Sequence, residues 1–190
     1  MEAFLVSTMV VAVGEIGDKT QLLALVLAAR FRRPAPIVLG ILVATLANHT
    51  IAGLVGAWVR QVVPVALLRW LLAASFLAVA LWALKPDRLE DEQASSATRL
   101  GVFAVTSTSF FLAEIGDKTQ IATVVLAAQF NNLVAVIAGT TLGMLIADVP
   151  VVLVGRAVAT RIPMRTVRVV AAGLFALLAI VALVAPSSSG

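Results

Sequence analysis

The chain contains no cysteine and one histidine among its 190 residues. Without cysteine it can form neither a disulfide framework nor a thiolate metal site, and a single histidine argues against a zinc-type cluster. Charge is also scarce, because 13% of the residues are charged while 61% are hydrophobic. Together with a mean hydropathy of +1.06, this composition excludes an ordinary soluble domain and indicates an integral membrane protein.

Six stretches are long and apolar enough to cross a bilayer as helices, which takes about 20 residues each. They are Phe4 to Ala29, Pro36 to Val59, Pro64 to Leu84, Gly101 to Ala128, Leu133 to Gly155 and Pro163 to Ala185. The first stretch lacks a preceding basic region and contains Glu15, Asp18 and Lys19. We therefore expect it to stay in the protein as a helix and not to be cleaved as a signal peptide.

The basic residues other than Lys19 and Lys118 predict how the chain is oriented. The connections after the first, third and fifth stretches hold ten of them: Arg30, Arg32, Arg33, Lys85, Arg88, Arg99, Arg156, Arg161, Arg165 and Arg168. The other side holds only Arg60 and Arg69. Under the positive-inside rule, both termini should face away from the cytoplasm. The net charge of +4 is then explained by basic residues that fix the orientation of the chain in the membrane, and we expect no nucleic-acid partner.

A seven-residue motif occurs twice, as E-I-G-D-K-T-Q at residues 15–21 and 114–120. The same offset of 99 positions also matches Phe31 with Phe130, Gly40 with Gly139, Gly56 with Gly155, Pro64 with Pro163 and Arg69 with Arg168. Each copy spans three helices, so the second enters the membrane from the opposite side. Inverted repeats with a binding site at mid-membrane are a common plan of secondary transporters.

The predicted fold is therefore an all-α integral membrane protein with six transmembrane helices arranged as two inverted three-helix repeats. We place the first repeat at residues 1–84, a cytoplasmic polar linker at 85–100, the second repeat at 101–185 and a tail at 186–190. One chain could form a complete site between its two repeats, and the sequence leaves a monomer and a homodimer both open.

The motif acids indicate a cation site. On a continuous helix Glu15 and Asp18 share a face, as do Glu114 and Asp117. A charged side chain at the bilayer centre costs roughly 2.5–3.5 kcal/mol, and close carboxylates resist joint ionisation unless a cation or a proton lies between them. Four motif acids and two motif lysines leave two surplus negative charges, which one divalent ion neutralises. Oxygen ligands alone suit Ca²⁺, Mn²⁺ or Mg²⁺.

The other motif residues have two interpretations each. Lys19 and Lys118 could pair with the glutamates four residues earlier and make insertion tolerable, or hold the empty site together and move aside when the ion binds. Four neighbouring side chains could complete or orient the cation's ligand shell, or instead bond their own helix and pack between helices. These are Thr20, Gln21, Thr119 and Gln120.

Polar residues in the second and fifth stretches add a second layer near the motifs. Asn48 and His49 lie in the second, and the repeat offset matches His49 with Asp148 in the fifth. Asp148 could be a further ligand or a proton acceptor. A histidine side chain ordinarily titrates near physiological pH, so His49 could relay protons or hydrogen-bond between helices.

The repeated E-x-G-D-K-T pattern resembles the signature of uncharacterised protein family 0016, cation transporters that include Golgi transmembrane protein 165 and bacterial manganese exporters. The resemblance covers nearly the whole chain. It implies transport of Mn²⁺ or Ca²⁺ in exchange for protons, with the ion as cargo and no prosthetic group. The cation-binding acids that it implies are Glu15, Asp18, Glu114 and Asp117.

We therefore expect a non-enzymatic antiporter of the bacterial cytoplasmic (inner) membrane, whose partners are lipid, divalent cations and protons. Three alternatives remain open from the sequence. Paired acids can hold a catalytic ion and activate water, as in an intramembrane metal-dependent hydrolase. A passive channel would conduct the ion without using the proton gradient, and the family's distant relation to lysine exporters leaves amino-acid export.

Overall fold

The computed structural model of the chain describes residues 1–84, 101–154 and 164–184. These residues form eight α-helices and, within those ranges, no strand. The helices are α1 (Glu2–Glu15), α2 (Lys19–Phe31), α3 (Pro34–Val62), α4 (Val65–Ala83), α5 (Val102–Glu114), α6 (Lys118–Gln129), α7 (Leu133–Val154) and α9 (Met164–Val184). The predicted linker 85–100, the tail 186–190 and the repeat matches at Gly155 and Pro163 lie outside the described residues.

The predicted helices at Phe4 to Ala29 and Gly101 to Ala128 are not continuous, which corrects the expectation from the sequence. The first consists of α1 and α2 and the second of α5 and α6, each pair being separated by three motif residues. Within these breaks Gly17 has φ +85° and Gly116 has φ +74°. Glycine reaches this left-handed region without the penalty of a Cβ atom. The conformation ends one helix and lets the next start in a new direction.

The remaining four apolar stretches correspond to α3, α4, α7 and α9, each a single helix over its described residues. Pro150 lies inside α7, which nevertheless continues to Val154. By length and composition, α3 and residues Leu133–Leu153 of α7 could each cross a membrane, and α4, α5 and α9 contain shorter apolar segments.

The two halves pack against each other through equivalent contacts. α1 packs against α7, and α3 packs against α5. A Cβ atom added to Gly139 would lie 2.5 Å from the carbonyl oxygen of Phe4, and one added to Gly40 would lie 3.1 Å from that of Phe103. Both members of the first contact lie 99 positions from their counterparts in the second. Glycine at these two positions therefore allows the same close approach twice, with the halves exchanged.

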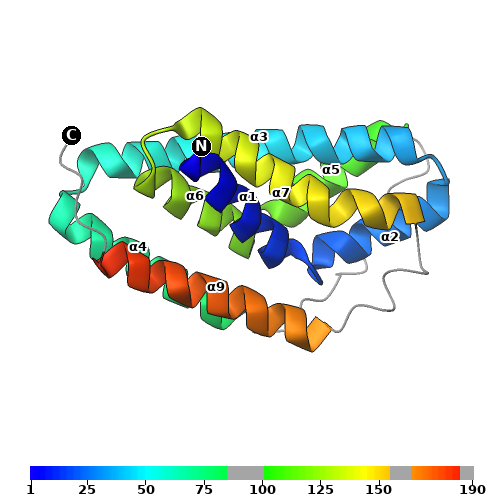
Figure 1. Ribbon diagram of the computed structural model, residues 1–190. Helices are drawn as coiled ribbons and strands as arrows, with labels where there is room; N and C mark the ends of the chain where they lie inside the picture. The colour runs from blue at the N-terminus through cyan, green and yellow to red at the C-terminus, as the bar shows by residue number, and fades with distance from the viewer. Residues whose placement is uncertain (85–100, 155–163, 185–190) are drawn as a thin grey trace.

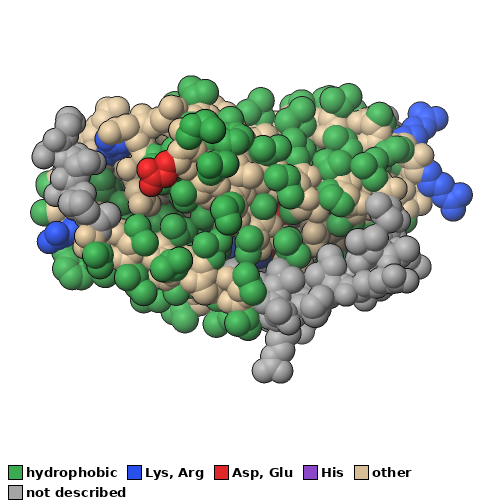
Figure 2. All heavy atoms as spheres, viewed as in Figure 1, with side chains coloured by type: hydrophobic (Ala, Val, Ile, Leu, Met, Phe, Trp, Pro, Cys, Tyr) green, Lys and Arg blue, Asp and Glu red, His purple; other side chains and the backbone are tan. Residues whose placement is uncertain are grey.

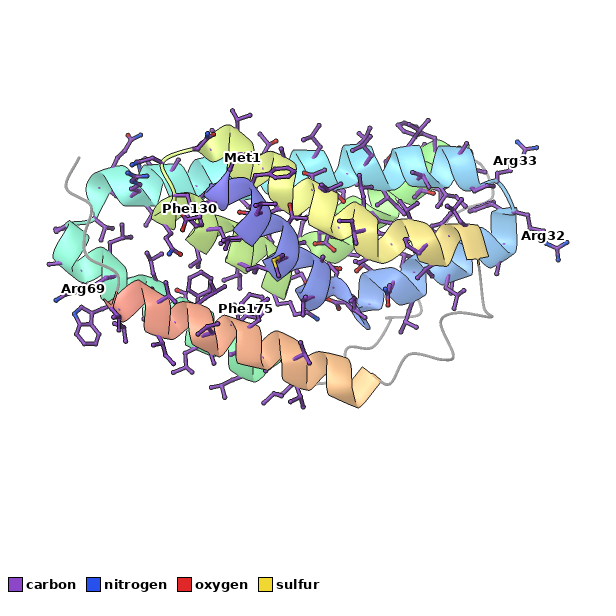
Figure 3. All side chains as sticks on the ribbon, viewed as in Figure 1. Met1, Arg32, Arg33, Arg69, Phe130 and Phe175 are labelled. Atoms are coloured by element: carbon purple, nitrogen blue, oxygen red, sulfur yellow. The ribbon has the colours of Figure 1, made fainter. Side chains whose placement is uncertain are left out.

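The third helices of the halves, α4 and α9, lie side by side along one edge of the bundle (Figure 1). The rings of Phe76 and Phe175, also 99 positions apart, meet there with centroids 6.5 Å apart. Figure 3 shows Phe175 pointing from α9 toward the other helices. In Figure 1, α2 continues from α1 toward one end of the bundle and α6 continues from α5 toward the other. The two broken helices therefore run in opposite directions.

The surface is apolar around the middle and basic at the ends. Figure 2 shows hydrophobic side chains over most of the visible face, with Lys and Arg side chains at its two ends. Arg32 and Arg33 lie at one end of the bundle and Arg69 lies at the other (Figure 3). Large apolar side chains are exposed at many positions on this surface, among them Trp58 and Trp70.

Candidate cation site

The two helix breaks lie next to each other inside the bundle and are joined by two ion pairs. Lys19 Nζ lies 3.1 Å from Asp117 Oδ1, and Lys118 Nζ lies 2.5 Å from Asp18 Oδ2. Each pair joins one motif to the other, and exchanging the two repeats turns one pair into the other. The two motifs, which lie 99 positions apart in the chain, therefore form a single structural unit.

Three motif carboxylates come together at this junction. Glu15, Glu114 and Asp117 each offer one oxygen, and these oxygens all lie within 4.8 Å of one another. All three side chains are at most 1% exposed. Glu15 and Glu114 end helices α1 and α5, so the helix breaks carry both glutamates to the same point.

One oxygen of each glutamate is held and the other is not. The Thr20 hydroxyl donates to Glu15 Oε2 (2.6 Å), and the Thr119 hydroxyl donates to Glu114 Oε2 (3.1 Å). Glu15 Oε1 and Glu114 Oε1 have no hydrogen-bond partner among the described residues. Leaving buried carboxylate oxygens unpaired is costly. An oxygen-rich site of this kind suits a hard divalent cation.

Asp18 does not belong to this group of three, although the sequence grouped it with the other acids. It caps α2, where its Oδ1 accepts a hydrogen bond from the Lys19 backbone N–H (2.5 Å) and its Oδ2 pairs with Lys118. Asp117 caps α6 more loosely, since its Oδ2 accepts from the Thr119 N–H and hydroxyl at 3.4 Å each. Four acids lie at the junction, and three of them present oxygens to one point.

The breaks also correct one prediction about spacing and remove the basis for one of the two interpretations of the lysines. Glu15 and Asp18 were expected on one helix face, but Glu15 ends α1 and Asp18 caps α2. The four-residue pairing of each lysine with the glutamate before it required the same continuous helix. The lysine ion pairs that the structure shows instead cross between the repeats.

The motif glutamines stabilise the broken backbone. Gln21 Oε1 accepts a hydrogen bond from the Gly17 N–H (2.9 Å), and Gln120 Oε1 accepts from the Gly116 N–H (2.7 Å). Their amide nitrogens reach the opposite half, where Gln21 Nε2 donates to the carbonyl oxygen of Ala147 at 3.0 Å. Each glutamine therefore satisfies a backbone N–H that the missing helical turn leaves without a helical partner.

Asn48 lies at the position equivalent to Ala147 and has the corresponding role. Gln120 Nε2 donates to Asn48 Oδ1 (3.5 Å), and Asn48 Nδ2 donates to the carbonyl oxygen of Phe111 (3.0 Å). Asn48 thus ties α3 to the second broken helix, beside the acids and not among them.

His49 and Asp148 are both fully buried, on α3 and α7 respectively. Within the described residues, neither ring nitrogen of His49 and neither oxygen of Asp148 has a hydrogen-bond partner. Asp148 is close enough to Glu15 and Glu114 for a Coulombic interaction. It is therefore a fifth acid at the edge of the cluster.

Thr45, which no sequence pattern singled out, is buried on α3, and its hydroxyl also lacks a hydrogen-bond partner among the described residues. It lies one turn before His49 on α3, so the four-residue spacing could have placed both on the same inward face.

Comparison with known proteins identifies the family. The model of the family described as divalent cation/proton antiporter GDT1 matches residues 3–91 and 102–189. A protein of Vibrio cholerae named "Putative manganese exporter" is 50% identical over 181 residues, which cover 95% of this chain and 90% of that protein. A GDT1-like protein of Synechocystis sp. is 34% identical over 201 residues, covering 95% and 96% of the two chains. No solved structure matches. The chain therefore belongs to the GDT1 family of divalent cation/proton antiporters.

Proposed function

We propose that this membrane protein exports Mn²⁺ from the cytoplasm in exchange for protons, and that the ion binds at the junction of the two helix breaks. The observation that carries the proposal is the group of buried oxygens from Glu15, Glu114 and Asp117 within 4.8 Å of one another. Manganese is chosen over calcium because the Vibrio cholerae relative is named for manganese. Both ions accept carboxylate oxygen.

The charge of the site supports exchange for protons. Five acids (Glu15, Asp18, Glu114, Asp117 and Asp148) and two lysines lie at or beside the junction. Five negative and two positive charges leave three surplus negative charges when all groups are ionised. One divalent cation leaves one of these, so neutrality requires a proton as well. When the cation departs, protons can take its place on the same carboxylates, which couples the two fluxes.

The same proposal includes six membrane spans arranged as two inverted repeats. Three observations support it: contacts recur with the halves exchanged, the broken helices run in opposite directions, and the family model matches each half separately. Broken helices that meet at mid-membrane are a feature of secondary transporters. The distribution of basic residues supports an orientation with both termini on the non-cytoplasmic side of the cell membrane, and the proposal includes a site formed within one chain.

The test is Mn²⁺ flux in proteoliposomes under an imposed pH gradient. The wild-type protein should accumulate Mn²⁺ against its gradient in a saturable manner, and Glu15→Gln and Glu114→Gln should abolish this. Glu2→Gln, which removes an exposed carboxylate from the same helix as Glu15, should transport normally. Running the assay with Ca²⁺ in place of Mn²⁺ ranks the two ions.

Other outcomes would favour the alternative functions. Flux that does not saturate and ignores the pH gradient would indicate a channel. Metal-dependent hydrolysis without flux would indicate an enzyme. Unchanged transport by both glutamine variants would show that the ion binds elsewhere.

A further inference from the structure

The two motifs have the same seven residues but not the same surroundings. The Lys118 side chain is 5% exposed and its partner Asp18 is fully buried, whereas the Lys19 side chain is 25% exposed beside Asp117. Gly17 is partly exposed and its equivalent Gly116 is exposed. Gln21 is buried and its equivalent Gln120 is partly exposed. The groups around Asp18, namely its partner Lys118 and its own motif's Gly17 and Gln21, are therefore more buried than the equivalent groups around Asp117.

The two aspartates differ in the same way. Both oxygens of Asp18 are engaged at 2.5 Å, one with Lys118 and one with the Lys19 backbone. The contacts of Asp117 with Lys19 and Thr119 range from 3.1 to 3.4 Å. Asp117, the more loosely held aspartate, is the one that presents an oxygen to Glu15 and Glu114. The glutamates contribute from both repeats and the aspartate from only one.

We propose that the cation changes its aspartate ligand during transport. Glu15 and Glu114 hold it throughout, Asp117 completes the site in the conformation described here, and Asp18 completes it in the conformation that faces the other side. This inference rests on the proposed function and specifies how the same site is used from the two faces of the membrane.

Identical sequences are the physical reason to expect this exchange. Because both heptapeptides consist of the same residues, each can adopt the other's conformation. Only the neighbouring residues then decide which of the two aspartates is held in the tight, buried ion pair. In the exchanged state Lys19 holds Asp117 in a tight buried pair while Lys118 loosens from Asp18. In each state one lysine thus forms a close pair with the aspartate that the cation does not use: Lys118 with Asp18 in the described state, and Lys19 with Asp117 after the exchange. Transport then alternates between two arrangements of one packed unit.

The neighbours of the two motifs are not identical, so the two states need not be equally populated. Asn48 and His49 on α3 correspond to Ala147 and Asp148 on α7. Gln120 contacts the side chain of Asn48, whereas Gln21 contacts the backbone of Ala147. These differences favour one of the two conformations, while both remain accessible to the protein.

The test compares Asp18→Asn and Asp117→Asn from both faces of the membrane. The KM for Mn²⁺ is measured in right-side-out and in inverted vesicles, with Glu2→Gln as the control. Loss of one ligand should raise the KM about tenfold or more, because even outer-shell changes typically cost 10–100-fold in metal affinity. We expect Asp117→Asn to do so at one face with less than about a threefold change at the other. Asp18→Asn should show the reverse pattern.

Equal effects of both variants at both faces would overturn the inference and indicate one fixed four-acid site. If a variant does not turn over, equilibrium Mn²⁺ binding to sealed vesicles with metal on one side provides the same comparison. Failure of the proposed function would look different. In that case the wild-type protein would itself show no pH-driven Mn²⁺ flux in either kind of vesicle.

Discussion

Replacing Lys118 by methionine tests the ion pairs between the repeats. The substitution keeps the length and much of the apolar stem of the side chain but removes its ammonium group. Asp18, fully buried and 2.5 Å from Lys118 Nζ, would then lose its nearest positive charge. Removing one member of a buried pair costs about 3–5 kcal/mol. The folded-to-unfolded ratio should therefore fall by a factor of roughly 100 or more.

The double variant Lys118→Met/Asp18→Asn should recover most of this loss, because no uncompensated charge remains buried. Lys19→Met should cost less than Lys118→Met, because the Lys19 side chain is 25% exposed and water can reach the pair. The assay is a double-mutant cycle from denaturant unfolding in detergent, with a chelator present so that bound metal does not contribute. If Lys118→Met is as stable as the wild type, or if the cycle shows no coupling to Asp18, the cross-repeat pairing is refuted.

Four further predictions concern two glycines, Asp148 and the effect of pH. Gly116→Ala should lower the free energy of unfolding by about 1–2 kcal/mol, because φ is +74° there and an L residue is strained in that region. The control is Gly173→Ala, where an added Cβ also meets nothing within 4 Å. Equal stability of the two variants in thermal unfolding would contradict the explanation. Gly139→Ala should cost about 1–3 kcal/mol by overpacking, because its Cβ would lie 2.5 Å from the Phe4 carbonyl oxygen; a wild-type melting temperature would show that α1 and α7 are not so close. Asp148→Asn should reduce the number of protons exchanged per Mn²⁺ in flux assays. In the wild type, lowering the pH at the face where Mn²⁺ is loaded should raise the KM for Mn²⁺, because protons compete for the same carboxylates. An unchanged proton stoichiometry and a pH-independent KM would argue against acids shared by the two ions.

Much of the helical pattern could be predicted because it depends on local composition. Each of the six apolar stretches corresponds to one described helix or to two consecutive ones. The 99-residue offset also relates contacts that could not be seen in the sequence, such as Gly40 with Phe103 and Gly139 with Phe4.

The helix breaks could not be predicted because distant residues stabilise them. A glycine inside a long apolar run is common in continuous membrane helices, so Gly17 and Gly116 alone do not indicate a break. What stabilises the break at Gly17 is a hydrogen bond from its N–H to Gln21 and the ion pair of Asp18 with Lys118 in the other half. The structure brings Glu15, Glu114 and Asp117 together, whereas the expected helix register was wrong and the lysine ion pairs cross between the repeats.

The most direct test of the central claim is anomalous scattering from a crystal of the protein grown or soaked with Mn²⁺. We expect one strong manganese peak between the two helix breaks, coordinated by Glu15, Glu114 and one motif aspartate. A peak elsewhere, or Glu15 and Glu114 turned toward separate neighbours with no metal between them, would contradict the proposed site.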